Sequence, residues 1–239
     1  MEVATIKRMV CGGCGAPNAV GTGWCSKCGE DMDERATIRE TPCPFCALYF
    51  KVDAIVEKEG IQDPPLRIGE EVVRYVDKEY LAFDALHSVS DFQINVIPRA
   101  HIESLSTLDA SGTGVEDKKA LLQRMHALGM EVASAFCGPD EVYELGKETF
   151  TVAFNDPPSV AHLHVYVIRL PYTRNTEWMW SSALCFPRAK TLAHVLSSLE
   201  ACGSCCTGTN REESERTAHE DERARLVQLH IDRSSRDDS

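Results

Sequence analysis

Two closely spaced cysteine pairs near the amino terminus restrict the folds open to this chain. Cys11 and Cys14 form the first CxxC pair, and Cys25 and Cys28 form the second one ten residues later. Each pair places two thiolates on one tight turn, and two such turns supply the four sulfur ligands of a tetrahedral Zn²⁺ site. The segment has too few apolar residues to fold without the metal. We therefore predict a structural zinc ribbon over residues 1–42, with four free thiols or a redox pair as the alternatives.

The charge of the ribbon bears on its partner. Residues 1–42 carry five basic and six acidic side chains, and the whole chain has a net charge of −12. Extended contact with a phosphate backbone requires a basic surface, so this composition argues against nucleic acid as a partner. We expect the ribbon to contact a protein partner or to brace the neighbouring domain.

Cysteine usage and hydropathy indicate the compartment and the domains. The eleven cysteines fall mostly in short pairs, which is typical of metal binding in a reducing compartment, so we expect a cytoplasmic or nuclear protein. No apolar run is long enough to span a membrane, and no signal peptide is expected. The chain can bury one main domain, predicted at residues 43–200, before an acidic and partly disordered tail at 201–239. The role of Cys202, Cys205 and Cys206 in that tail stays open.

Hydrophobic periodicity predicts an α+β domain in which an antiparallel sheet surrounds one long helix. Two β-prone runs separated by a polar turn, at 72–76 and 80–83, predict a hairpin. Further strands are expected at 92–97, 150–154 and 163–168. Apolar residues spaced by three and four predict a helix from about Val115 to Phe136 and another around residues 192–199. The apolar stripe of the longer helix consists of Leu121, Met125, Leu128, Val132 and Phe136.

Two histidines one residue apart stand in the apolar run of residues 159–168. Strand alternation would place His162, His164 and Tyr166 on one face, with Leu163 toward the core. A neutral imidazole is a nucleophile, an acid–base group or a metal ligand. The pair marks a candidate catalytic site, and the alternative is two satisfied polar residues on a strand.

Four blocks of residues 43–170 resemble, in the correct order, the histidine-triad (HIT) superfamily of nucleotide hydrolases and transferases. They are Cys43-Pro44-Phe45-Cys46, Tyr80-Leu81-Ala82-Phe83, Asn95-Val96-Ile97-Pro98-Arg99-Ala100-His101, and Phe154-Asn155 with Ser159-Val160-Ala161-His162-Leu163-His164. The resemblance implies a HIT-like α+β domain behind the ribbon, with a nucleotide as its small-molecule substrate. It also allows a homodimer, which the residues themselves do not specify.

The resemblance also assigns roles to residues. His164 would attack a nucleotide α-phosphate to form a nucleotidyl-histidine, and His162 would orient it through a ring hydrogen bond. Nucleotide and phosphate binding would fall to His101, Asn155, Ser159 and Tyr166. We expect a nucleotide phosphoramidase, a dinucleoside-polyphosphate hydrolase or a nucleotidyltransferase. The alternative is a catalytically degenerate domain that binds a nucleotide or a protein, and processing of DNA ends or RNA caps ranks last.

Three departures from the family pattern are expected to slow or silence the site. Tyr166 replaces the third histidine, and a phenol stays neutral and donates protons poorly at pH 7. Pro157 and Pro158 remove N–H donors from the loop that binds phosphate in the family. The ribose-binding acidic position falls on Ala85, and Asp84 would point to the opposite face unless a bulge turns it.

Cys43 and Cys46 raise the question of a second zinc site. In some HIT proteins such a pair shares zinc with a histidine on the strand before the third block. Gln93 occupies that position and is a poor zinc ligand, so His87 or His101 would have to replace it. The alternative is two small residues packed under the sheet.

Overall fold

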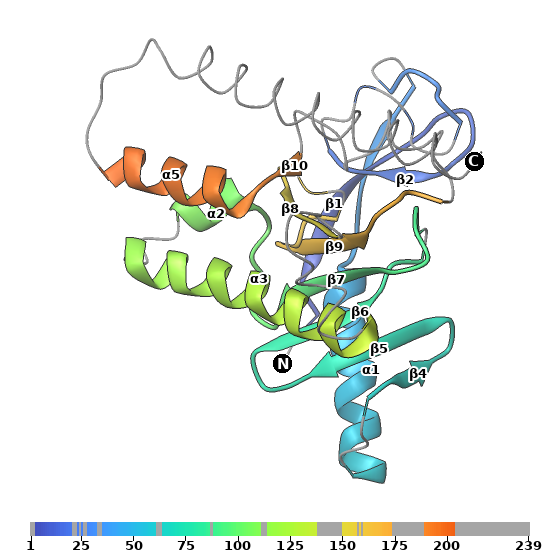
Figure 1. Cartoon of the computed structure of the whole chain (residues 1–239). Helices are drawn as coiled ribbons and strands as arrows, with labels where there is room; N and C mark the ends of the chain where they lie inside the picture. Colours follow the sequence, from blue (N-terminus) through green and yellow to red (C-terminus); the bar gives the residue numbers. More distant parts are fainter. Residues whose placement is uncertain are drawn as a thin grey trace, which may run out of the picture.

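The computed structural model describes residues 3–20, 23, 25, 28–32, 35–60, 64–86, 88–110, 114–137, 150–156, 158, 160–173 and 189–203. Their strands form two antiparallel sheets (Figure 1). The smaller sheet has the order β2-β1-β3, where β1 is Thr5–Val10, β2 is Pro17–Asn18 and β3 is Thr37–Pro42. It belongs to the cysteine-rich amino-terminal part and leads directly into the main domain.

The main sheet has seven strands in the order β10-β8-β9-β7-β6-β5-β4. Its strands are β4 Leu66–Ile68, β5 Glu71–Val76, β6 Tyr80–Asp84, β7 Gln93–Pro98, β8 Phe150–Asn155, β9 Val165–Arg169 and β10 Ala189–Lys190. Every pairing between neighbours in this sheet is antiparallel. The α+β class and the β5–β6 hairpin predicted from the sequence are therefore confirmed.

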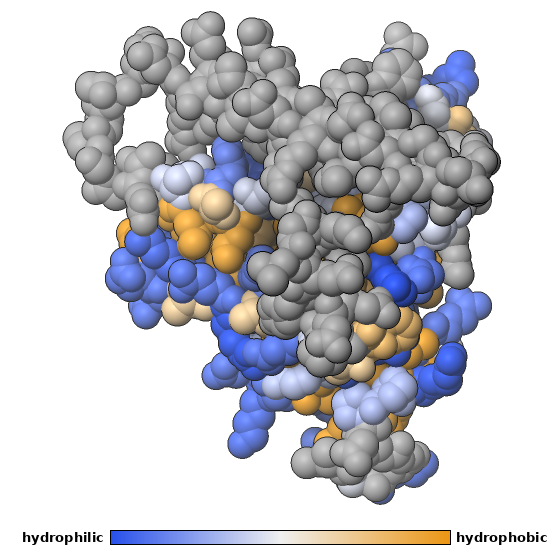
Figure 2. All heavy atoms as spheres, viewed as in Figure 1, coloured by the Kyte–Doolittle hydropathy of each residue, from blue (hydrophilic) through white to orange (hydrophobic). Residues whose placement is uncertain are grey.

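Helices cover both faces of the main sheet. They are α1 Pro44–Glu59, α2 Leu105–Ala110, α3 Val115–Cys137 and α5 Leu192–Gly203. The long helix α3 lies across β6, β7 and β9 with α5 beside it, whereas α1 packs on the opposite face (Figure 1). Figure 2 shows apolar residues gathered over α5 and the adjoining side of α3, next to a mainly hydrophilic surface. None of the described helices is both long and apolar enough to cross a membrane.

The helix α1 is an element that the sequence analysis did not predict, although its signals are present. Pro44 stands at its first turn, where the missing N–H costs nothing. Gly60 ends it with a positive φ of 81°. Leu48, Tyr49 and Val52 recur at helical spacing and pack into the core on the α1 face of the sheet. Both cysteines of the Cys43–Cys46 block lie at its amino-terminal end.

The predicted stripe of α3 is correct at its centre and wrong at its ends. Met125, Leu128 and Val132 are buried, as expected. Leu121 is only partly buried, and Leu122 takes the core position beside it. Phe136 is 46% exposed, and its ring lies against Phe92 with the ring centroids 4.6 Å apart. The buried face of α3 is thus rotated slightly from the predicted one.

Several predictions fall outside the described residues. They concern the loop residues Pro157 and Ser159, the candidate ligand His87, and residues 204–239 of the predicted tail, which include Cys205 and Cys206. The side chain of Cys202, near the end of α5, is also outside the described set.

The close approach of α3 to the sheet yields a stability prediction. A Cβ on Gly129 would stand 2.6 Å from Cγ2 of Val167, a buried and stiff β-branched side chain. Gly129→Ala should gain about 0.5–1 kcal/mol of helix propensity and lose about 1–3 kcal/mol to overpacking. We therefore expect a lower melting temperature in thermal unfolding.

Val167→Ala provides the internal control, because it removes the methyl group in conflict. The double variant Gly129→Ala/Val167→Ala should be more stable than the sum of the two single effects predicts. A melting temperature for Gly129→Ala above that of the wild type would contradict the close contact.

Candidate functional site

The four amino-terminal cysteines form one cluster, as the sequence analysis predicted. The Sγ atoms of Cys11, Cys14, Cys25 and Cys28 all lie within 4.8 Å of one another. Gly15 and Gly29, with φ of 71° and 73°, close the two turns that present the pairs. The Sγ atoms of Cys14 and Cys25 are 3.5 Å apart, and those of Cys11 and Cys28 are 3.7 Å apart. Four converging sulfurs are the donor set of a structural zinc site.

A second cluster joins the other cysteine pair to two histidines. Ligand atoms of Cys43, Cys46, His101 and His162 lie within 4.8 Å of one another. The distance from Cys43 Sγ to His162 Nδ1 is 3.4 Å, and the distance from Cys46 Sγ to His101 Nδ1 is 3.3 Å. Both cysteines and His162 are buried. Two sulfurs and two imidazoles form a second donor set suited to zinc.

The ring of His162 is prepared to act as a ligand. Its Nε2–H donates to the carbonyl oxygen of Pro98 at 2.9 Å, which leaves the Nδ1 lone pair facing the two sulfurs. Burial lowers the pKa of His162 to about 4, so the imidazole is neutral at pH 7. The sequence analysis assigned this residue only to catalysis. Its membership of the cysteine cluster is a relation that spacing along the chain does not show.

The structure also resolves which residue joins Cys43 and Cys46. His101, which follows β7, lies in the cluster, as one of the two alternatives proposed. Gln93 instead uses its Oε1 to accept a hydrogen bond from the Val89 backbone N–H at 2.9 Å. The cysteines therefore do not merely pack under the sheet, because their sulfurs converge on two imidazoles.

His164 lies directly before β9 and is only 3% exposed. Its Nδ1–H donates to the main-chain carbonyl oxygen of His162 at 2.8 Å. This bond fixes the ring and leaves Nε2 as the unprotonated nitrogen. Burial lowers the pKa of His164, against the opposing effect of that hydrogen bond, and keeps the ring neutral. His162 thus orients His164 through its backbone, not through its ring as expected.

Phe45 is a site residue that the sequence analysis missed. It stands between Cys43 and Cys46, at the start of α1. Its ring meets His162 and His164 edge-on, with centroid distances of 5.7 and 5.5 Å. On its other side it contacts Phe83 of β6. Its position between Cys43 and Cys46 is the sequence signal that could have identified it.

Asn155 and Tyr166 occupy the strands beside the nucleophile candidate. The antiparallel register of β8 and β9 pairs Phe154 with Val165, so continuing it by one residue would bring Asn155 opposite His164. Asn155 is buried, and its Oδ1 has no hydrogen-bond partner among the described residues. Tyr166 is 1% exposed and packs with Val89. Val165 and Val167 of β9 thus face the main core, and Tyr166 faces the opposite side of the sheet, as predicted.

The acidic residue nearest to the ribose position is engaged elsewhere. Asp84 accepts two hydrogen bonds from the Arg74 guanidinium, at 2.7 and 2.8 Å. The Arg74 Cζ lies 4.9 Å from the ring centroid of Phe136, so this pair is on the α3 side of the sheet. The register shift of the hairpin falls between Val73 and Tyr75 in β5, not at Asp84. The bulge that would turn Asp84 toward the site does not occur.

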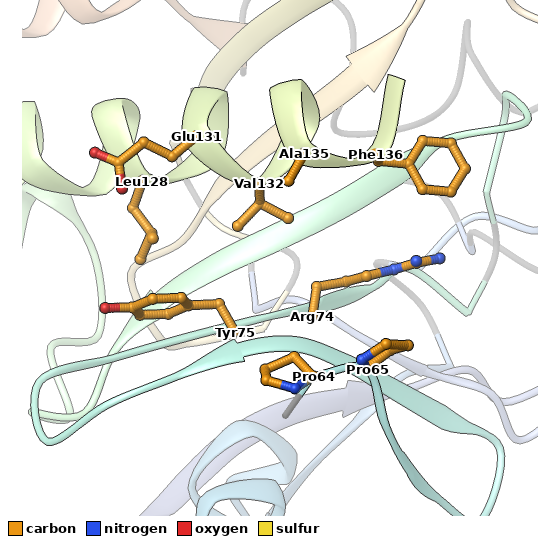
Figure 3. Close-up of a pocket in the computed structure, with 9 residues that line it drawn as sticks. All are labelled: Pro64, Pro65, Arg74, Tyr75, Leu128, Glu131, Val132, Ala135 and Phe136. Carbon is orange, nitrogen blue, oxygen red and sulfur yellow. The ribbon is translucent and has the colours of Figure 1, made fainter. Parts of the chain in front are cut away.

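A hollow of about 380 Å³ lies between α3 and the hairpin, away from His164. Figure 3 shows Leu128 and Val132 of α3 facing Tyr75 and Arg74 of β5, with Pro64 and Pro65 at the far rim. Its lining includes neither of the histidines nor the cysteines. It therefore does not form part of the candidate site.

Comparisons with known proteins find one family model that matches part of the chain. Residues 65–179, just under half of the chain, match the family described as scavenger mRNA decapping enzyme C-term binding. None of the curated proteins compared matches the sequence significantly.

Several solved structures are similar to part of this chain, and three of them follow. A HIT family hydrolase from Legionella pneumophila Philadelphia 1 is 20% identical, with a TM-score of 0.34, over 53% of this chain and 90% of that one. The aprataxin ortholog Hnt3 in complex with DNA is 16% identical, with a TM-score of 0.38, over 77% of this chain and 99% of that one. A Zn-bound histidine triad family protein from Mycobacterium smegmatis is 18% identical, with a TM-score of 0.31, over 68% of this chain and 96% of that one.

The paired histidines before β9 and strands β4 to β9 of the main sheet fall within the segment that the family match covers, whereas β10 lies beyond it. Residues 65–179, which match that family model, follow an amino-terminal four-cysteine cluster in this chain.

Proposed function

We propose that this chain is a nucleotide hydrolase or nucleotidyltransferase in which His164 attacks a nucleotide α-phosphate. The observation that carries the proposal is the hydrogen bond from His164 Nδ1 to the His162 carbonyl oxygen. It fixes the neutral tautomer whose Nε2 lone pair is available for attack. An N–P bond forms at Nε2 while the bond from phosphorus to the leaving group breaks. Water or another acceptor then breaks the N–P bond and restores the imidazole.

The surroundings of His164 indicate which leaving groups suit this site. Tyr166 stands where the family's third histidine would be, and it is buried and neutral. The described residues around His164 thus include no group that readily gives a proton to a leaving amine at pH 7. We infer a preference for anhydride substrates, whose phosphate leaving groups depart as anions, over nucleoside phosphoramidates. Asn155, opposite His164, would donate its amide N–H to a phosphate oxygen.

We propose that zinc occupies both cysteine clusters in a structural role. Cys11, Cys14, Cys25 and Cys28 would hold one ion, and Cys43, Cys46, His101 and His162 the other. Bound zinc supplies fixed geometry at these four-ligand sites and leaves no coordination position for a substrate. At the second site the ligand His162 would be held in place, together with the carbonyl group that orients His164.

A binding module without turnover is the second candidate function. Asp84 is paired with Arg74 on the wrong face for a ribose, and the edge of Phe45 lies against a nearly enclosed His164. The net charge led us to expect no nucleic-acid partner. One of the similar solved structures, however, is an aprataxin ortholog in complex with DNA, which does not fit that expectation. Nucleotide-bearing DNA ends therefore belong among the ligands tested. A cytoplasmic or nuclear location stays a prediction.

The variant His164→Asn tests the nucleophile. It should lower turnover of a dinucleoside polyphosphate by about 10³-fold or more, because the attacking nitrogen is lost. Wild-type protein mixed with the substrate and quenched should carry an acid-labile nucleotidyl group on His164 in mass spectra, and the variant should carry none.

His126→Asn is the matched control, since His126 lies half-buried on α3, outside the site. It should keep wild-type turnover. Equal turnover by His164→Asn and wild type would refute the nucleophile, whereas nucleotide binding without turnover or adduct in the wild type would establish the binding module.

The variant Cys46→Ser tests the second metal site. Purified wild-type protein should contain about two zinc ions per chain, and the variant about one, as measured by elemental analysis. Its melting temperature should also fall because His101 and His162 lose the metal ion that joins them to the two cysteines. Cys137→Ser, at the end of α3, should retain both ions. An unchanged zinc content in Cys46→Ser would exclude the second site.

A further inference from the structure

A short antiparallel ladder connects the two cysteine clusters. Strand β1 ends at Val10, directly before Cys11 of the first cluster. Strand β3 ends at Pro42, directly before Cys43 of the second cluster. The two strands pair continuously from Thr5 opposite Pro42 to Val10 opposite Thr37. One cluster therefore lies at each end of the same ladder.

The inner end of the ladder is tied to the second cluster. The backbone N–H of Cys43 donates to the carbonyl oxygen of Ala4 at 2.7 Å. The side chain of Ile6 is 2% exposed and packs with Cys43 and Cys46. Arg8, which alternation places on the same face of β1 as Ile6, interacts electrostatically with Cys43.

The same face of β1 also contacts the segment that leads to the nucleophile. Val160 and Ala161 pack in one cluster with Ile6. The backbone N–H of His162 donates to the carbonyl oxygen of Val160 at 2.6 Å. The segment covered by β1 therefore continues directly into His162, whose carbonyl oxygen holds the ring of His164.

Among the described residues, few side chains are buried at the outer end of the ladder. They are Cys11, Asn18, Cys25 and Met32, with a few partly buried neighbours. A small sheet with so small a core is marginal in water unless something else fixes it. A metal bound to the four cysteines would fix the strand ends at Val10 and Thr37.

We propose that the ribbon braces the site: metal at its four cysteines fixes the β1–β3 ladder, and β1 holds Cys43 and residues 160–162 in place for the second cluster. The inference rests on the metal occupancy proposed above. It assigns the ribbon a positioning role inside this chain, distinct from contact with a partner protein.

Cobalt titration of the full chain can follow the two clusters separately, because Co²⁺ in a four-sulfur site and in a two-sulfur, two-nitrogen site absorbs differently. Ile6→Ala removes the contact between β1 and the second cluster while leaving all eight ligands intact. Ile38→Ala is the matched control, because it makes the same change on the same ladder at a side chain that is 61% exposed. Cys28→Ser, at an exposed cysteine, disables the first cluster.

The brace predicts that Ile6→Ala and Cys28→Ser each weaken Co²⁺ binding at the second cluster by about tenfold or more. Both variants should also speed amide hydrogen exchange at residues 160–164, whereas Ile38→Ala should change neither quantity. Affinity and exchange within about twofold of wild type in both variants would overturn the brace.

No substrate is used, so the result does not depend on the proposed chemistry. If wild-type protein binds no Co²⁺ at the second cluster, the proposed metal site fails. The brace is then tested by comparing the rate of amide hydrogen exchange at residues 160–164 in Ile6→Ala with the rate in Ile38→Ala.

Discussion

The position of His162 is the constraint on which the rest of the candidate site depends. Its ring is enclosed by Cys43, Cys46 and His101, and its Nε2–H is bound to the Pro98 carbonyl oxygen. Its backbone carbonyl oxygen in turn accepts the hydrogen bond from His164. One residue therefore links a buried cysteine–histidine cluster to the tautomer of the nucleophile candidate. Disturbing the cluster would move the carbonyl group, and with it the ring of His164.

The chemistry supported by this arrangement is selective. A neutral histidine with one nitrogen bound to a carbonyl oxygen favours the covalent step. The later needs of the reaction are met less well, because Tyr166 is enclosed and Asp84 is engaged by Arg74 on the far face. Under the proposed function, the site would favour attack on phosphorus and would protonate a leaving amine poorly. Substrates with anionic leaving groups fit this balance.

The sequence predicted the elements with strong hydrophobic periodicity and the cluster built from closely spaced cysteine pairs. The hairpin, α3 and the four-cysteine cluster follow from local patterns, and the structure contains all three. The second cluster was only half predicted, because Cys43 and His162 are 119 positions apart and their meeting depends on tertiary packing. The route by which His162 orients His164 is a backbone interaction, which residue identity does not encode. The sequence analysis did not predict α1, although Pro44 and Gly60 mark its two ends.

Determining the tautomer of His164 tests the central claim most directly. Long-range ¹H–¹⁵N correlation spectra of histidine-labelled protein report which ring nitrogen carries the proton. At pH 7 the account predicts a neutral ring with the proton on Nδ1 and none on Nε2, because Nδ1 is bound to the His162 carbonyl oxygen and burial lowers the pKa. A proton on Nε2, or a charged imidazolium at this pH, would contradict it.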